Sequence, residues 1–162
     1  MLLSPWFVRF LLAAAAVVIS HLFEWHWLRY LTSEANLQVD SLAGLRLERL
    51  SSDTVLWHGI VFRYVTACTF IDVWFGSIPL LWSLRRTIQH NLQFLLAFAL
   101  ALFCFNAVRL SISDVLFNAG TPWWIAHDLL GAFAYFAVWC WMMNRRDWER
   151  GLSVSDDRAL WA

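Results

Sequence analysis

The sequence predicts an all-α polytopic membrane protein with about four transmembrane helices and a small strand or hairpin element outside the membrane. Of the 162 residues, 60% are hydrophobic, whereas soluble domains contain about 45–50%. Four apolar stretches approach the roughly 20 residues that a helix needs to cross a bilayer. The chain also contains 12 Trp, a residue that collects where the apolar core of a membrane meets the headgroups.

The first predicted span is 5–31, and the length of the chain fits a single membrane domain, 1–162. The start of this span also has the character of a signal peptide, but no clear cleavage site of small residues follows it. The mixed segment 32–68 is predicted to lie outside the membrane, with a short interfacial helix over 42–50. Its β-branched and aromatic part, 54–67, predicts two strands around a turn at His58-Gly59.

The remaining predicted spans are 69–84, 92–110 and 123–143, with a loop over 111–122 and a polar tail, 144–162. Arginine pairs follow two of these spans: Arg85 and Arg86 after the second, and Arg145 and Arg146 after the fourth. The 111–122 loop contains no arginine, so the positive-inside rule places both termini and the loop after the second span in the cytoplasm. The segment 32–68 and the 111–122 loop are then extracytoplasmic.

The three cysteines are Cys68, Cys104 and Cys140, and their odd number and wide spacing predict neither a disulfide framework nor a zinc motif. Cys104 and Cys140 fall within spans and are interpreted as packing residues. Cys68 falls at the outer end of the second span, Arg109 at the outer end of the third and His127 at the outer end of the fourth. A histidine or arginine lowers the pKa of a nearby thiol, so these three types suit a thiol nucleophile site.

Three short motifs resemble the exosortase/archaeosortase family: Ala67-Cys68-Thr69, Asn106-Ala107-Val108-Arg109 and His127-Asp128-Leu129-Leu130-Gly131. The resemblance covers roughly residues 54–140. Members of this family are polytopic membrane proteins with a Cys, Arg, His triad on the extracytoplasmic side. Two features depart from the pattern: Phe70 stands where the family often has glycine, and many members have more than four spans.

The resemblance implies a cysteine transpeptidase or protease of the bacterial or archaeal inner membrane. Its substrates would be secreted proteins with a C-terminal sorting tail, made of a short motif, a transmembrane helix and a basic end. Carried over, Cys68 attacks the scissile carbonyl, His127 acts as general base and then acid, and Arg109 stabilises the oxyanion or orients the substrate. The resemblance implies no cofactor.

Two polar residues are predicted to support the triad from within the helices. Asn106 lies three residues before Arg109, so the two share a helix face. Asp72 follows Cys68 by four residues and, in a helix, would share its face. Asp72 is therefore a candidate partner for Arg109, although a carboxylate there would also raise the pKa of the thiol.

Other candidates lie around the expected outer surface. Asp128 either orients the imidazole of His127 or simply favours the start of a helix electrostatically. Arg63, in the predicted hairpin, and Ser111 and Ser113, after the third span, are candidates for substrate contacts.

Two other functions remain open at this point. A four-helix bundle can hold haem between two histidines, and His26 and His127 both lie toward the outer side, so a haem- or quinone-associated electron carrier is one alternative. A non-catalytic membrane subunit is the other. A nucleic-acid partner is disfavoured, because 12 basic and 12 acidic residues cancel and no basic block occurs. No metal site is predicted, since no cluster has ligand spacing.

Overall fold

The computed structural model describes residues 5–159, and the side chains of residues 6–144. It is mostly helical, with a small antiparallel sheet. The helices are α1 (Pro5–Ser20), α2 (His26–Leu42), α3 (Ile71–Leu81), α4 (Ile88–Asn118) and α5 (Leu130–Ala159), with a 3-10 helix, η1 (Thr66–Thr69), and a π-helix, η2 (Trp124–Leu129). The strands are β1 (Glu48–Arg49), β2 (Thr54–Trp57) and β3 (Ile60–Arg63).

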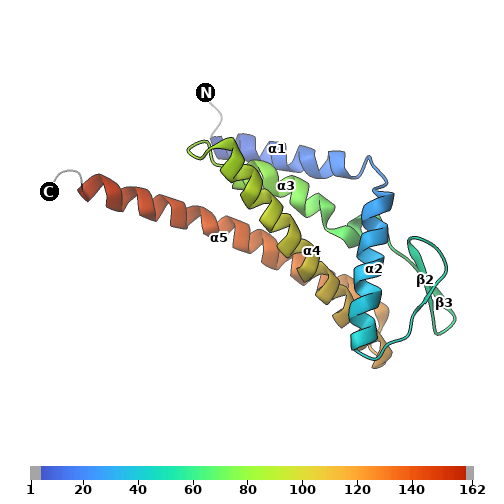
Figure 1. Cartoon of the computed structure of the whole chain (residues 1–162). Coiled ribbons are helices and arrows are strands. Elements are labelled where there is room, and N and C mark those ends of the chain that lie inside the picture. Colours follow the sequence, from blue (N-terminus) through green and yellow to red (C-terminus); the bar gives the residue numbers. More distant parts are fainter. Residues whose placement is uncertain (1–4, 160–162) are drawn as a thin grey trace.

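The helices α1, α3, α4 and α5 form a bundle, and the sheet lies at one end of it (Figure 1). Helix α1 packs along α3, and α2 turns steeply away from α1 to pack on the end of α4. The sheet, α2 and the α4–α5 connection gather at this end, whereas the α3–α4 connection lies at the other. The predicted combination of helices with a small strand element is therefore confirmed.

The predicted first span, 5–31, is wrong as a single helix, because α1 ends at Ser20. The Ser20 hydroxyl donates to the carbonyl of Val17 at 2.7 Å, and the indole of Trp25 donates to the carbonyl of Ser20 at 2.7 Å. Side-chain bonds of this kind satisfy carbonyls that a continuing helix would use. Trp25 itself has φ 45°, in the left-handed region, and the chain turns there into α2.

Helix α2 was not predicted, and the expected interfacial helix over 42–50 is wrong. The buried face of α2 is polar, formed by Arg29, Thr32, Ser33, Asn36 and Asp40. A search for apolar residues at helical spacing cannot detect such a face. Within 42–50 the chain instead forms β1.

The predicted hairpin is confirmed. Strands β2 and β3 are antiparallel, with Trp57 opposite Ile60. The two residues between them, His58 and Gly59, have φ 51° and 79°. Two consecutive residues with positive φ are typical of the two-residue loop that matches the twist of a hairpin. Strand β1 adds a third strand along β2.

Two helical stretches are long and apolar enough to cross a membrane, Ile88–Asn118 and Trp124–Asn144. Helix α3 has 11 residues, with Pro79 near its end, and therefore extends only about 16 Å. Helix α4 continues eight residues past the predicted span end, so most of the expected 111–122 loop is helical. Helix α5 likewise continues to Ala159, through most of the predicted polar tail, 144–162; residues 160–162 of that tail lie outside the described residues.

Large apolar side chains cover the outer faces of α4 and α5. Leu96, Leu100, Phe133 and Phe136 are each more than 60% exposed. Contiguous exposed apolar surface indicates a membrane or a partner rather than water. This pattern supports membrane association through these two helices.

The centre of the bundle is close-packed around α3. Phe70, Val73 and Leu102 belong to one buried cluster. A Cβ atom placed on Gly76 would lie 2.9 Å from Val17 Cγ2 and 3.0 Å from Trp139 Cη2. Only glycine lets α3 approach α1 and α5 so closely, and the position of α3 fixes the segment that precedes it, which carries Cys68.

Candidate functional site

A cleft of about 290 Å³ opens at the end of the bundle that carries the sheet. Its lining includes Cys68 of η1, His127 and Asp128 of η2, Arg63 of β3 and Asp114 of α4. Four separate elements thus converge on one cavity. It brings together two of the three predicted catalytic residues, Cys68 and His127.

Cys68 is held by its backbone. Its N–H donates to the carbonyl of Val65 at 2.9 Å, and its own carbonyl accepts from Nδ2 of Asn106 at 2.6 Å. The residue is 8% exposed. Burial raises the pKa of the Cys68 thiol, although a backbone hydrogen bond of Val65 to the thiol and the charge of Arg109 act in the opposite direction. The thiol is therefore protonated at neutral pH, and its use as a nucleophile requires a base.

Arg109 is placed behind the cleft rather than in it. Its Nη2 donates to Oδ1 of Asn106 at 3.0 Å, which confirms that the two residues share a helix face. The guanidinium lies 5.3 Å from the centre of the Phe70 ring, and Nη1 lies 3.4 Å from the Cβ position of Gly131. Arg109 does not appear among the described residues that line the cleft. It therefore orients Asn106, which in turn holds the carbonyl of Cys68.

Phe70 adopts a backbone conformation that glycine prefers. It has φ 56° and immediately precedes α3. The resembling family often has glycine at this position, and left-handed backbone is the conformation that glycine supplies without strain. Here the ring is 1% exposed and packs edge-on against Tyr135 at 4.4 Å. Burial of the ring against Tyr135 and Arg109 offsets the strain of this conformation.

His127 lies in the π-helix η2, a type of helical turn that is rare and frequent at functional sites. Its Nδ1 lies 3.0 Å from Oδ1 of Asp128, and its ring stacks on Trp123 at 4.6 Å. The predicted contact between Asp128 and the imidazole is therefore present. A proton assigned to Nδ1 by this carboxylate leaves Nε2 as the nitrogen that can accept one.

Asp72 does not bind Arg109, contrary to the sequence prediction. Its carboxylate accepts from the hydroxyl of Tyr135 at 2.9 Å and lies 3.5 Å from Nε2 of His21. The same hydroxyl lies 3.3 Å from the carbonyl of Ala67. Asp72, on α3, thus contacts α5 and the residue that follows α1, directly behind the segment that carries the cysteine.

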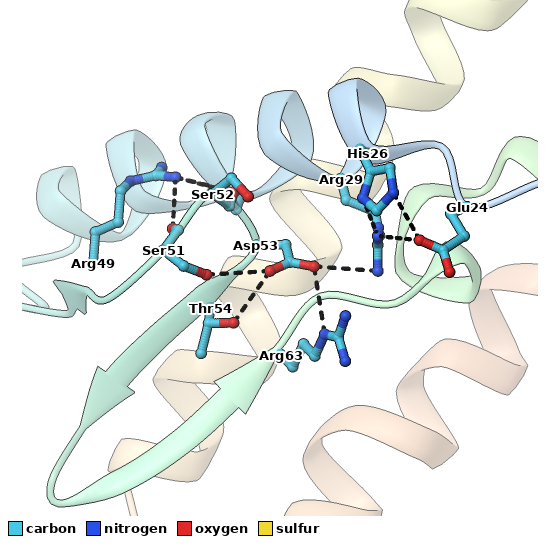
Figure 2. Close-up of polar contacts among 10 residues, drawn as sticks. Glu24, His26, Arg29, Arg49, Ser51, Ser52, Asp53, Thr54 and Arg63 are labelled. Carbon is cyan, nitrogen blue, oxygen red and sulfur yellow. Dashed lines mark hydrogen bonds and ion pairs between the residues drawn. The ribbon is translucent and has the colours of Figure 1, made fainter.

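Arg63 reaches the edge of the cleft from a polar cluster centred on Asp53, toward which Arg29 and Arg63 both point (Figure 2). The carboxylate lies 3.2 Å from Nη1 of Arg29 and 3.4 Å from Nε of Arg63. Burial alone would raise the pKa of Asp53, but neighbouring hydrogen bonds, led by that of Thr54, and the charge of Arg29 lower it. The cluster connects the hairpin to α2, and the Asp53 contact holds Nε of the Arg63 side chain.

His26 occupies the other side of this cluster (Figure 2). Its Nδ1 lies 2.6 Å from Nη2 of Arg29, and its Nε2 lies 2.7 Å from Glu24. An axial haem ligand needs a free imidazole nitrogen. The contacts of His26 therefore count against the predicted haem alternative.

The sequence analysis did not predict a buried cluster of polar residues between α2 and α4. Nδ2 of Asn36 lies 2.6 Å from Oδ2 of Asp40 and 2.7 Å from Oδ2 of Asp114. Ser111, predicted to contact substrate, donates instead to Asn36 Oδ1 at 3.4 Å. Only the spacing of Asn36 and Asp40, one helical turn apart, hinted at this group, because its α4 members lie more than 70 residues away.

Ser113 is also buried away from the cleft, since its hydroxyl donates to the backbone carbonyl of Arg109 at 3.0 Å. Among the residues that the structure describes, no three His, Cys, Asp or Glu side chains gather where they could share a metal ion. No family model, no curated protein and no solved structure matches this chain. The chemistry of the site is therefore argued from its own geometry.

Proposed function

We propose that this protein is an exosortase-like cysteine transpeptidase or protease of the bacterial or archaeal inner membrane. Its substrates would be secreted proteins with a C-terminal tail made of a short motif, a transmembrane helix and a basic end. One observation carries the proposal: Cys68 and His127 line the same cleft, and Asp128 holds Nδ1 of the histidine.

The proposed reaction begins with proton transfer from the Cys68 thiol to Nε2 of His127. The thiolate then attacks the scissile carbonyl and forms a tetrahedral intermediate. As the intermediate collapses, the C–N bond breaks and His127 gives the proton to the leaving amine. An acceptor amine or water subsequently attacks the thioester and releases Cys68.

The raised pKa of Cys68 suits this sequence of steps. A thiol that stays protonated until a base and substrate are both in place is protected from unwanted oxidation. Asp128 would stabilise the imidazolium that forms, as the third member of many nucleophile–base pairs does. Arg109 would act as a positioning residue through Asn106.

The membrane setting is supported by the exposed apolar faces of α4 and α5 and by their length. The proposed topology has four helices in the bilayer, with the short α1 and α3 completing the bundle. The cleft then lies at the outer surface, where the tail of a secreted protein leaves the bilayer. A substrate helix could reach this cleft laterally from the lipid.

Replacing Cys68 with Ala tests the proposal. We expect a secreted protein with such a tail to lose it in cells with the natural protein and to keep it in cells with Cys68→Ala. The tail is followed by mass spectrometry of the C-terminus. Cys104→Ala is the matched control and should leave cleavage unchanged, because Cys104 is exposed on α4. Tail removal by Cys68→Ala at the normal rate would refute the proposal.

A further inference from the structure

The carboxyl groups of Asp40 and Asp114 meet at a single amide nitrogen. Nδ2 of Asn36 lies within 2.7 Å of an oxygen of each. Asp40 is 0% exposed and Asp114 is 8% exposed. Ser111 donates to the amide oxygen of Asn36, which supports the orientation in which the nitrogen faces both acids.

Two carboxylates so close together and so buried cannot both be ionised, because their mutual repulsion and desolvation both oppose the second charge. Among the described residues, no arginine or histidine forms an ion pair with either of them. Burial also raises the pKa of Asp40. The pair therefore retains one proton at neutral pH and titrates as a unit.

The charged and titratable groups around the pair come from the segment of Tyr64 and η1 and from α4, and the cleft that Asp114 lines adds Arg63, His127 and Asp128. Tyr64, which precedes η1, is buried beside Asn36. Arg109 acts electrostatically on Asp114, and Cys68 acts electrostatically on Tyr64. Burial raises the pKa of Tyr64, so this neighbour stays uncharged. Arg109 is the cation whose charge acts on Asp114, and its guanidinium is engaged by Asn106 and Phe70.

Only one member of the pair faces the cleft. Asp114 lines it together with Cys68 and His127, whereas Asp40 lies behind it on α2. The proposed reaction needs a donor for the oxyanion of the tetrahedral intermediate. Arg109, the residue that the sequence predicted as this donor, does not line the cleft.

We infer that Asp114 is a catalytic residue whose carboxyl carries the one proton of the pair and presents it to the cleft as a hydrogen-bond donor for the oxyanion. This inference rests on the proposed function. The proton stays on the pair throughout: the bond from Cys68 Sγ to the carbonyl carbon forms, the C=O electron pair moves to oxygen, and the Asp114 carboxyl hydrogen-bonds to it. Asp40 is a positioning residue, because its negative charge keeps the proton on its neighbour.

Two substitutions of Asp114 test whether it acts as a hydrogen-bond donor. Asn keeps an N–H donor at this position, whereas Ala has none. In Asp114→Asn the amide N–H can still donate, so turnover should stay within about tenfold of the natural protein. In Asp114→Ala the donor is gone, and the expected loss of turnover is about 100- to 1000-fold. Equal, complete loss in both variants with an intact fold, or no loss in Asp114→Ala, would overturn the inference.

Asp40→Asn tests the positioning role through the pH profile. Without the charge at position 40, the Asp114 carboxyl loses its proton at lower pH. The fall in turnover on the alkaline side should therefore move to lower pH in Asp40→Asn, and this component should be absent in Asp114→Asn. A purely structural role of Asp40 would lower turnover evenly across pH and would contradict the assignment.

Infrared spectroscopy of the full chain in detergent gives a readout that does not depend on cleavage. The natural protein should show a protonated-carboxyl band at neutral pH, part of which disappears in both Asp114→Asn and Asp40→Asn. Asp128→Asn is the control and should leave that part intact, since Asp128 is exposed. If the band changes as expected but the natural protein cleaves no tail, the proposed function fails, whereas the assignment of one retained proton to the Asp40–Asp114 pair stands. If the band is missing, the inference fails whatever the cleavage result.

Discussion

Cys68 is held so that its reactivity depends on the groups around it. The carbonyl of Cys68 accepts a hydrogen bond from Asn106 of α4, and the carbonyl of Ala67 lies 3.3 Å from the hydroxyl of Tyr135 of α5. These contacts fix the backbone of η1, while burial disfavours the thiolate. The backbone of Cys68 is therefore fixed, and its thiol keeps its proton at neutral pH.

The pH dependence of alkylation measures this state directly. In a Cys104→Ala/Cys140→Ala background, the rate of Cys68 alkylation should rise with pH, with a midpoint above the ordinary thiol value of about 8.5. Burial disfavours the thiolate, so the thiolate fraction at neutral pH is lower than that of a free thiol. Stopped or quenched reactions followed by mass spectrometry give the rates.

The control places a cysteine on the exposed connection between α4 and η2, as Ala119→Cys in a background with all three natural cysteines replaced by Ala. Its alkylation should show an ordinary midpoint. A Cys68 midpoint equal to or below that of the control would contradict the raised pKa. Steric protection alone lowers the rate at every pH and leaves the midpoint unchanged, so the two effects separate.

At the scale of elements, the close approach of α3 to its neighbours decides where η1 lies. Helix α3 contacts α1 and α5 through Gly76, at distances that leave no room for a side chain. A shift of α3 would move Phe70 and, through it, the segment of Cys68. Packing within the bundle and geometry of the cleft are therefore coupled.

Replacing Gly76 with Val should destabilise the protein by about 1–3 kcal/mol, the usual cost of overpacking. Thermal unfolding in detergent micelles, followed by circular dichroism, measures the change. Ala15→Val is the matched control, since Ala15 lies on an exposed face of α1. An equal effect of the two substitutions would show that the close contact at Gly76 contributes nothing specific.

The whole molecule has two chemically different ends. The sheet and α2 lie at one end, and the connection with Arg85 and Arg86 lies at the other (Figure 1). Residues of β3 and η1, at the sheet end, line the cleft. Arginine retained on the cytoplasmic side would orient the bundle with the cleft outward. The proposed function needs this orientation, because its substrates are secreted.

Single cysteines test the orientation, placed in the background without Cys68, Cys104 and Cys140. Ser51→Cys should react with a membrane-impermeant maleimide in intact cells, whereas Leu84→Cys should react only after lysis. Both positions are exposed, so accessibility within the protein does not distinguish them. The reverse pattern would refute an outward cleft, and equal labelling in intact cells would refute a bundle that spans the membrane.

Local sequence was sufficient for the elements whose signals are local. Apolar length predicted the helices that became α4 and α5, and β-branched residues around His58-Gly59 predicted the hairpin, because its turn geometry is set by two adjacent residues. Helix α2 was missed because its buried face is polar. The extents of α1 and α4 were misjudged because a Trp25 contact ends one helix and tertiary packing extends the other.

The sequence by itself determined that the chain has long apolar helices and carries Cys68, Arg109 and His127 near their ends. Only the tertiary structure decided which of these residues share a cavity. In the folded chain, Cys68, His127 and Asp114 line one cleft, and Arg109 lies behind it. Asp72 binds Tyr135 instead of Arg109. Contacts between side chains more than 70 residues apart depend on how the helices pack against one another. The periodicity of residues along one helix contains no information about that packing.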